Sequence, residues 1–71
     1  MTNEKLLEQK IKESGKKVTY LAEKVGLSYA GFRNCVTNKA EFKASHIHIL
    51  CKELDIKPME MLTIFFAKSG A

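Results

Sequence analysis

Apolar residues recur along most of the chain at the three- and four-residue spacing of one face of an α-helix. Residues typical of helix ends interrupt this pattern four times, so that it divides into five short helices. We expect four of them at about 3–14, 18–25, 29–36 and 58–67, and one more that begins after Ser45. No segment shows the alternation of apolar and polar residues that marks a half-buried strand. The pattern therefore predicts an all-α fold, a compact five-helix domain.

The predicted helix ends carry residue types that such positions favour. Gly15 and Gly26 can adopt the left-handed backbone conformation that closes a helix, and Asn38 is one of the few other residue types that tolerate it. At the helix starts we expect capping side chains at Asn3, Ser28 and Ser45, and a proline at the first helical position, Pro58. These signals support the same division into five helices.

The apolar spacing also predicts which side chains form the core. In the first four helices the expected inward-facing residues are Leu7, Ile11, Leu21, Ala22, Val25, Phe32, Cys35, Val36, Ile47, Leu50, Cys51 and Leu54. In the last helix we expect Met61 and Leu62 to pack inward with one of Phe65 and Phe66. Adjacent residues point about 100° apart on a helix, so the two phenylalanines cannot face the same core. Phe65 and Phe66 are therefore candidates for a protein-contact surface; the alternative is that this helix only wraps the edge of the domain.

Length and composition narrow the class of protein. With 71 residues, of which 45% are hydrophobic, the chain suits a single small globular domain over residues 1–71. No segment approaches the roughly 18 uncharged apolar residues of a membrane helix, and residues 1–5 do not begin a secretion signal. We therefore expect a cytoplasmic protein that does not enter membranes. Cys35 and Cys51 fall at apolar helix positions, so no disulfide is expected.

Charge points to an anionic partner. The formal net charge is +4, and the excess lies in the first two-thirds of the chain, as a nucleic-acid partner would require. His46, His48 and Cys51 offer three metal ligands, but zinc needs four and the two histidines diverge on a helix. Neither a catalytic cluster nor a glycine-rich phosphate loop is present. We expect no enzyme activity, no metal and no cofactor.

Residues 18–36 have the pattern of two helices that cross steeply through a short turn. Such a crossing needs a small residue on the first helix and a turn residue that accepts a positive φ. Ala22 and Gly26 meet these demands. The apolar anchors that must flank them are present at Leu21, Val25, Phe32 and Cys35. This spacing is that of a helix-turn-helix; the alternative is an ordinary helical hairpin within a bundle.

Over about Leu6 to Leu62, the chain resembles the helix-turn-helix family of the lambda repressor and Cro. The residues that carry the resemblance are Leu21, Ala22, Val25, Gly26, Ser28, Ile47, Leu50, Cys51, Leu54 and Ile56. The segments 28–32, 41–43 and 64–66 also resemble small Cro-like proteins of temperate phages from Gram-positive bacteria. The resemblance implies a transcription regulator that binds double-stranded operator DNA. Family members commonly bind palindromes as dimers, so a homodimer is a further implication, although nothing in the sequence fixes its interface.

The resemblance also implies roles for individual residues. The helix at 29–36 would lie in the major groove and present Tyr29, Ala30, Arg33 and Asn34 to the bases. Arginine can bridge two acceptors of guanine and asparagine can pair with adenine, so Arg33 and Asn34 are the strongest candidates for base reading. The residues implied to bind backbone phosphates are Ser28, at the start of that helix, and Lys39 and Lys43, in the loop after it.

The chain departs from the family pattern at several positions. Many relatives begin the second helix with a polar residue that binds a phosphate, whereas Val18 stands here. Either this phosphate contact is lost, or Thr19 or Lys17 replaces it. Some relatives carry a buried arginine–glutamate pair between the first and third helices, where this chain has Ile11 and Val36. An apolar pair is an acceptable substitute for a buried ion pair.

Two functions remain open on the sequence. One is a Cro-like regulator of phage or prophage origin that occupies an operator and blocks or redirects polymerase. The other is an antirepressor that keeps the fold but acts by binding a partner repressor. The second function is favoured by Val18, by an exposed phenylalanine, and by Gly31, which costs the expected recognition helix about 1 kcal/mol relative to alanine.

Overall fold

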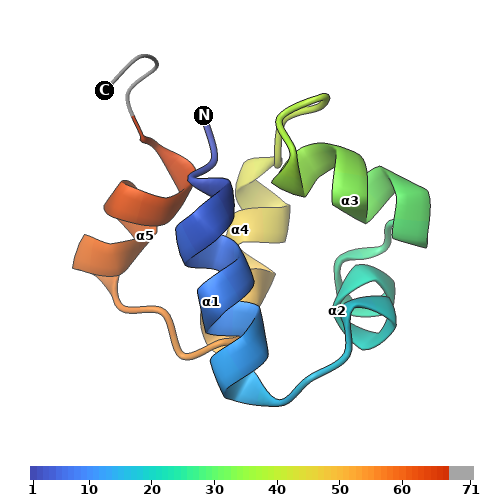
Figure 1. Ribbon diagram of the computed structural model, residues 1–71, viewed down its shortest axis with the longest axis horizontal. Helices are drawn as coiled ribbons and strands as arrows, with labels where there is room; N and C mark the ends of the chain where they lie inside the picture. Colours follow the sequence, from blue (N-terminus) through green and yellow to red (C-terminus); the bar gives the residue numbers. More distant parts are fainter. Residues whose placement is uncertain (68–71) are drawn as a thin grey trace.

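Five α-helices follow one another along the chain (Figure 1) in a computed structural model that describes residues 1–67. They are α1 (Glu4–Ser14), α2 (Val18–Val25), α3 (Tyr29–Val36), α4 (Ala44–Glu53) and α5 (Pro58–Phe65). Within residues 1–67 there is no strand, and no helix is long and apolar enough to cross a membrane. The predicted all-α fold is confirmed. Residues 68–71 of the expected domain lie outside the described part, and α5 ends two residues before the expected position 67.

Most of the predicted helix ends are confirmed. The Asn3 side chain accepts the Leu6 N–H at 3.1 Å and caps α1. The Ser28 hydroxyl accepts the Gly31 N–H at 3.0 Å and caps α3. Gly26 ends α2 with φ +80°, a backbone conformation that is strained for most residues other than glycine. These contacts satisfy backbone groups that the ends of a helix leave without a partner.

The expected cap at Ser45 is wrong, because α4 begins at Ala44, two residues earlier than a helix capped by Ser45 would. Its N-terminal flanking residue is Lys43, and Ser45 lies inside the first turn. The ring of His46 takes part in capping instead, since its Nδ1 accepts the Lys43 N–H at 3.2 Å. A histidine can close the turn in this way when the ring nitrogen carries a free lone pair.

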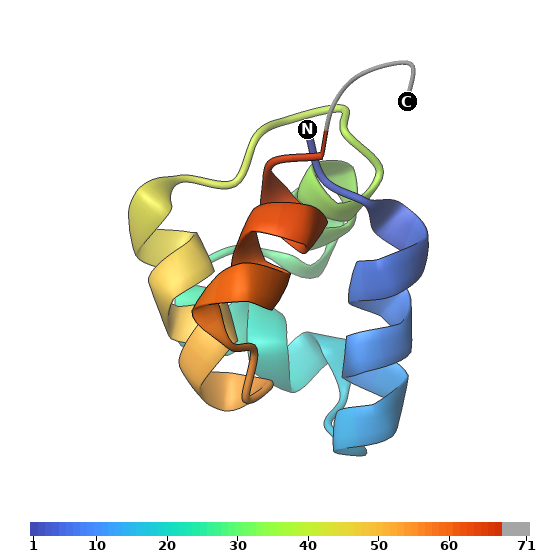
Figure 2. The ribbon, with the colours of Figure 1, turned by 90° about the vertical axis from the view of Figure 1, so that its left-hand side faces the viewer.

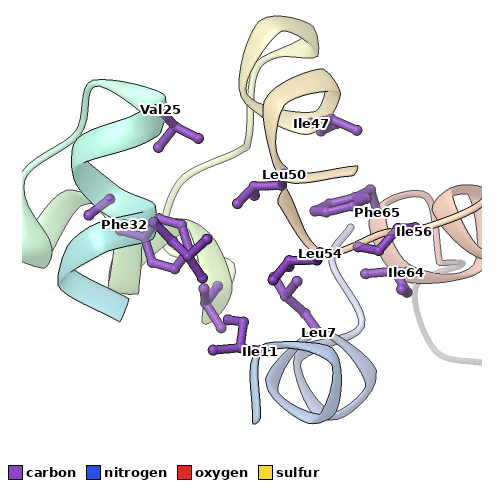
Figure 3. Packing of buried hydrophobic residues seen from close by; sticks show 13 residues of the cluster. Leu7, Ile11, Val25, Phe32, Ile47, Leu50, Leu54, Ile56, Ile64 and Phe65 are labelled. Atoms are coloured by element: carbon purple, nitrogen blue, oxygen red, sulfur yellow. The ribbon is translucent and has the colours of Figure 1, made fainter. Parts of the chain in front are cut away.

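The core lies where α4 meets the α2–α3 pair on one side and α5 on the other. Figure 3 shows Phe32 of α3 and Phe65 of α5 pointing toward Leu50 and Leu54 of α4 from opposite sides. The largest fully buried side chains are Leu7, Leu21, Phe32, Val36 and Leu50. Burial of this apolar surface is the main source of stability, because the short helices would be marginal in isolation.

The inward face of α5 differs from the expected one. Leu62, expected in the core, is 56% exposed, whereas Ile64 and Phe65 are buried. Phe65 packs edge-to-face on Phe42 with ring centroids 5.6 Å apart, and Phe42 packs in the same way on Phe32 at 5.7 Å. Phe42 lies in the loop before α4, outside any helical pattern, so the spacing of apolar residues did not place it in the core. Of the two adjacent phenylalanines, Phe65 is the one that packs on this ring, and Phe66 is exposed.

The N-terminal residues join α5 to the loop that follows α3. Thr2 is buried, and its backbone N–H and C=O both bond the Asn38 side chain, at 2.8 Å and 2.9 Å. On the other side, the Asn3 N–H donates to the Ile64 carbonyl at 2.6 Å. Figure 2, which has α5 in front between α1 and α4, shows the N-terminus beside the end of α5 and the loop. Asn38 itself has φ +68°, as expected from its tolerance of the left-handed region.

Replacing Ala22 by leucine should destabilise the fold. Ala22 is 2% exposed where α2 and α3 meet, and three more carbons would force the helices apart. Overpacking of this kind costs about 1–3 kcal/mol. Urea unfolding of Ala22→Leu measures the loss. Ala30→Leu adds the same carbons on the exposed face of α3 and should change stability little, so equal losses in the two variants would contradict tight packing at Ala22.

Candidate nucleic-acid interface

A steep crossing of α2 and α3 places α3 at the edge of the molecule. In Figure 1 α2 is seen almost end-on while α3 lies along its length, so the two axes are far from parallel. The turn between them is closed by hydrogen bonds from Gly26 N–H to the Glu23 carbonyl at 3.1 Å and from Leu27 N–H to the Ala22 carbonyl at 2.9 Å. Ala22, the small residue predicted for the crossing, is 2% exposed. The arrangement is that of a helix-turn-helix.

One face of α3 is buried and the other is open. Phe32, Cys35 and Val36 are buried, as predicted. Of the four candidates for base reading, Tyr29 is 56% exposed, Ala30 and Asn34 are also exposed, and Arg33 is half-buried. The open face thus carries an aromatic ring, a methyl group and an amide that are free to meet a partner.

Arg33 is turned toward α1 rather than straight outward. Its Nη1 donates to the Oε1 of Glu8 at 2.5 Å, and the two side chains are 30% and 46% exposed. The hydrogen bond to Glu8 raises the pKa of Arg33 above its ordinary value, against the opposing effect of burial. Arg33 is therefore a fixed positive charge whose guanidinium is oriented by a second helix.

Sequence reasoning missed Glu8, although a signal was present. Ile11 and Val36, expected to replace a buried ion pair, are indeed buried, at 6% and 0% exposure. Glu8 and Arg33 each lie three residues before one of these two, on the side where the helix surfaces reach solvent. An arginine–glutamate pair thus joins α1 and α3 one helical turn before Ile11 and Val36, the positions where a buried ion pair was considered.

The candidate phosphate-binding residues lie on the segments before and after α3. Lys17 and Thr19 are exposed at the start of α2, Ser28 is exposed at the start of α3, and Lys39 and Lys43 are exposed in the loop between α3 and α4. Within residues 1–67 none of the three lysines forms an ion pair. The Ser28 hydroxyl accepts the capping N–H but keeps its own hydrogen to donate. Val18 is half-buried against the core and offers no polar group.

Two other lysines are held away from this region by ion pairs. Lys10 contacts Glu60 of α5 at 2.6 Å, and Lys16 contacts Glu53 of α4 at 3.0 Å. The Tyr20 hydroxyl also donates to Glu53, at 3.0 Å. These ion pairs hold the pKa of both carboxyl groups below the ordinary value. The positive charges of Lys10 and Lys16 are thereby compensated within the protein.

The expected protein-contact surface reduces to Phe66. Phe65 is 4% exposed because its ring packs on Phe42, so the proposal of a contact surface there is corrected. Phe66 is 57% exposed and follows α5, on which Met59 and Leu62 are exposed too. A groove of about 400 Å³ runs beside them, lined by Leu6 and Ile64 among others and by the Lys10–Glu60 ion pair. This apolar surface belongs to α5, at the opposite end of the molecule from α3 (Figure 1).

Comparison with known proteins gives one match. Residues 6–66 match the family model described as the Cro/C1-type HTH DNA-binding domain. No curated protein and no solved structure matches the chain in the corresponding comparisons. The matched residues include all of α2 and α3 and most of α1.

The Asn38 side chain should stabilise the loop that carries Lys39. Asn38→Ala loses both hydrogen bonds to Thr2 and puts an alanine at φ +68°. We expect it to lower the free energy of unfolding by about 2–3 kcal/mol. Asn38→Gly loses the same bonds without the backbone strain and should cost about 1 kcal/mol less. Denaturant titrations of both variants measure the difference. An Asn38→Gly variant as stable as the unaltered chain would mean that the hydrogen bonds contribute nothing.

Proposed function

The chain belongs to the family of Cro/C1-type HTH DNA-binding domains, and we propose that it is a sequence-specific transcription regulator that inserts α3 into the major groove of double-stranded DNA. The observation that carries this proposal is the open face of α3, flanked on both sides in the sequence by exposed lysines that form no ion pair within residues 1–67. An α-helix fits the major groove of B-DNA, and uncompensated lysines attract its phosphates.

Base reading is assigned to Tyr29, Ala30, Arg33 and Asn34. The exposed Asn34 amide suits adenine, because its NH2 group can donate to N7 while its carbonyl oxygen accepts from the N6 amino group. The Ala30 methyl group and the Tyr29 ring offer apolar contact to the methyl group of thymine. Arg33 supplies the fork that suits guanine, provided that Glu8 leaves part of it available.

Phosphate binding is assigned to Lys17, Thr19, Ser28, Lys39 and Lys43. Their positions support the assignment, because all five are exposed and lie at the start of α2, at the start of α3 or in the loop between α3 and α4. Contacts to phosphates position the protein and supply most of the non-specific affinity, but they carry no sequence information. Lys17 and Thr19 would together replace the phosphate contact that the apolar side chain of Val18 cannot make.

We propose that the protein acts as a homodimer on a palindromic operator, as a Cro-like regulator of phage or prophage origin. Half-sites one helical turn apart have centres about 34–36 Å apart. The longest extent of the domain is 30 Å, so two copies on adjacent half-sites would come close to each other. Occupying such an operator would block or redirect polymerase.

A second candidate function is an antirepressor that binds a partner repressor. The observation that favours it is the apolar surface of Met59, Leu62 and Phe66, which nothing in residues 1–67 covers. The two functions separate in one experiment, a selection of bound sequences from random duplex DNA. A regulator enriches a consensus on its own, whereas an antirepressor enriches none and instead co-purifies with its repressor.

DNA affinity should fall steeply as salt rises. With four or five phosphate contacts per subunit, the logarithm of the binding constant should fall with the logarithm of the salt concentration at a slope of about −4 per subunit. Fluorescence anisotropy at several salt concentrations gives the slope. Binding that does not depend on salt, or no binding at low salt, would contradict the proposed function.

Substitutions on α3 and in the loop after it should have different consequences. Asn34→Ala or Arg33→Ala should cost about 1–3 kcal/mol on the selected site and relax the preference at one base pair. Lys39→Ala or Lys43→Ala should weaken binding to selected and scrambled duplexes equally, and reduce the salt slope by about one unit. Titrating each variant against both duplexes measures the ratio. If neither Asn34→Ala nor Arg33→Ala changes the ratio, α3 does not read bases.

A further inference from the structure

The contact between α1 and the open side of α3 is made by two charged side chains. Arg33 Nη1 donates to Glu8 Oε1 at 2.5 Å, and within residues 1–67 Arg33 has no other side-chain partner. Glu8 is not among the residues expected to meet DNA, and it belongs to α1 rather than to α3. Both side chains remain partly exposed, so the pair contributes little to folding stability.

We propose that Glu8 is a positioning residue that orients the Arg33 guanidinium for a guanine in the major groove, an inference that rests on the proposed function. Guanidinium carries its five N–H donors in a rigid plane, and only Nη1 is engaged by Glu8. The edge formed by Nε and Nη2 remains free. That edge can donate two hydrogen bonds to the O6 and N7 acceptors of guanine while Nη1 stays on Glu8.

Orientation matters because a free arginine side chain has many conformations. Ordering such a side chain when the complex forms opposes binding, and a contact that orders it beforehand reduces that cost. Glu8 provides the contact from a different helix, so the position of the guanidinium depends on how α1 is placed relative to α3. Removing Glu8 should therefore weaken the interaction of Arg33 with its guanine in particular.

The same carboxylate has a second, opposite effect on DNA binding. Its negative charge compensates Arg33 in the free protein and repels nearby phosphates. Arg33 therefore adds less to non-specific attraction than an isolated lysine does. Loss of Glu8 should raise affinity for any duplex while it lowers the preference for guanine. The charge effect acts on both duplexes, whereas the positioning effect acts only on the selected site, so the ratio of the two affinities tells them apart.

Glu4 supplies a matched control. It lies one turn before Glu8 on α1, and its charge acts on Arg33 from a distance without a hydrogen bond to it. Glu4→Gln removes one negative charge next to the same region but leaves the Glu8–Arg33 contact in place. Glu8→Gln removes the charge and keeps an amide oxygen at the position that accepts from Nη1. Glu8→Ala removes both the charge and the acceptor.

The test is to titrate the full chain and these variants against the selected duplex and against the same duplex with single base-pair changes. Arg33→Ala identifies the guanine–cytosine pair whose preference depends on Arg33. At that pair we expect Glu8→Ala to reduce the preference about 3- to 10-fold. We expect Glu8→Gln to recover most of the preference, and Glu4→Gln to leave it unchanged while both affinities rise. In the Arg33→Ala background, Glu8→Ala should change the preference no further.

Each outcome bears on the proposal. If Glu8→Ala and Glu4→Gln alter the preference equally, Glu8 acts by charge alone and the positioning role is overturned. An effect of Glu8→Ala that persists without Arg33, or no effect at all, overturns it too, while leaving base reading by Arg33 intact. If Arg33→Ala removes no guanine preference, base reading by this residue fails, and the inference fails with it. Thermal unfolding of Glu8→Ala checks that the variant is folded, which its exposed position leads us to expect.

Discussion

The close approach of α2 and α3 at Ala22 is the constraint on which the rest of the molecule depends. The small side chain lets the two helices cross steeply, and the positive φ of Gly26 lets the chain turn within a few residues. With α3 held at that angle, Phe32 and Val36 enter the core, and nothing in residues 1–67 covers the opposite side of the helix. The open face of the candidate site is therefore a consequence of how the core closes.

The features that sequence predicted well are those decided within one helix. Capping by Asn3 and Ser28, the turn at Gly26 and the buried side of α3 depend on residues a few positions apart, and local patterns report them. The errors concern the inward face of α5 and the start of α4. Leu62 was placed inward by spacing alone, whereas Ile64 and Phe65 face the core, with the ring of Phe65 on Phe42. Ser45 was a reasonable cap, yet Lys43 is the flanking residue two positions earlier, and the ring of His46 accepts its N–H.

The candidate site also has features that the sequence predicted and features that it did not. Periodicity predicted the buried side of α3, and the family resemblance implied that Tyr29, Ala30 and Asn34 would face outward, as they do. It could not predict that Arg33 would turn toward Glu8, since a helical pattern defines a face but not the neighbour that meets it. The bonds between Asn38 and Thr2 escaped for the same reason: the two residues are 36 positions apart in the chain. Pairing between side chains on different elements needs the packed structure.

The distribution of ion pairs suggests how the molecule separates attraction from discrimination. Lys10, Lys16 and Arg33 are each matched with a glutamate, so their charges contribute little beyond the protein surface. Lys39 and Lys43 have no such partner within residues 1–67, and they lie in the loop that Asn38 fixes to the N-terminal segment. Unmatched charge acts over about 8–10 Å at physiological salt and does not distinguish base pairs. A matched and oriented arginine acts only at contact distance, where the pattern of donors and acceptors decides the result. Loss of Glu8 would leave the charge of Arg33 uncompensated. Arg33 would then attract DNA of any sequence, as the lysines do, instead of acting mainly at contact distance.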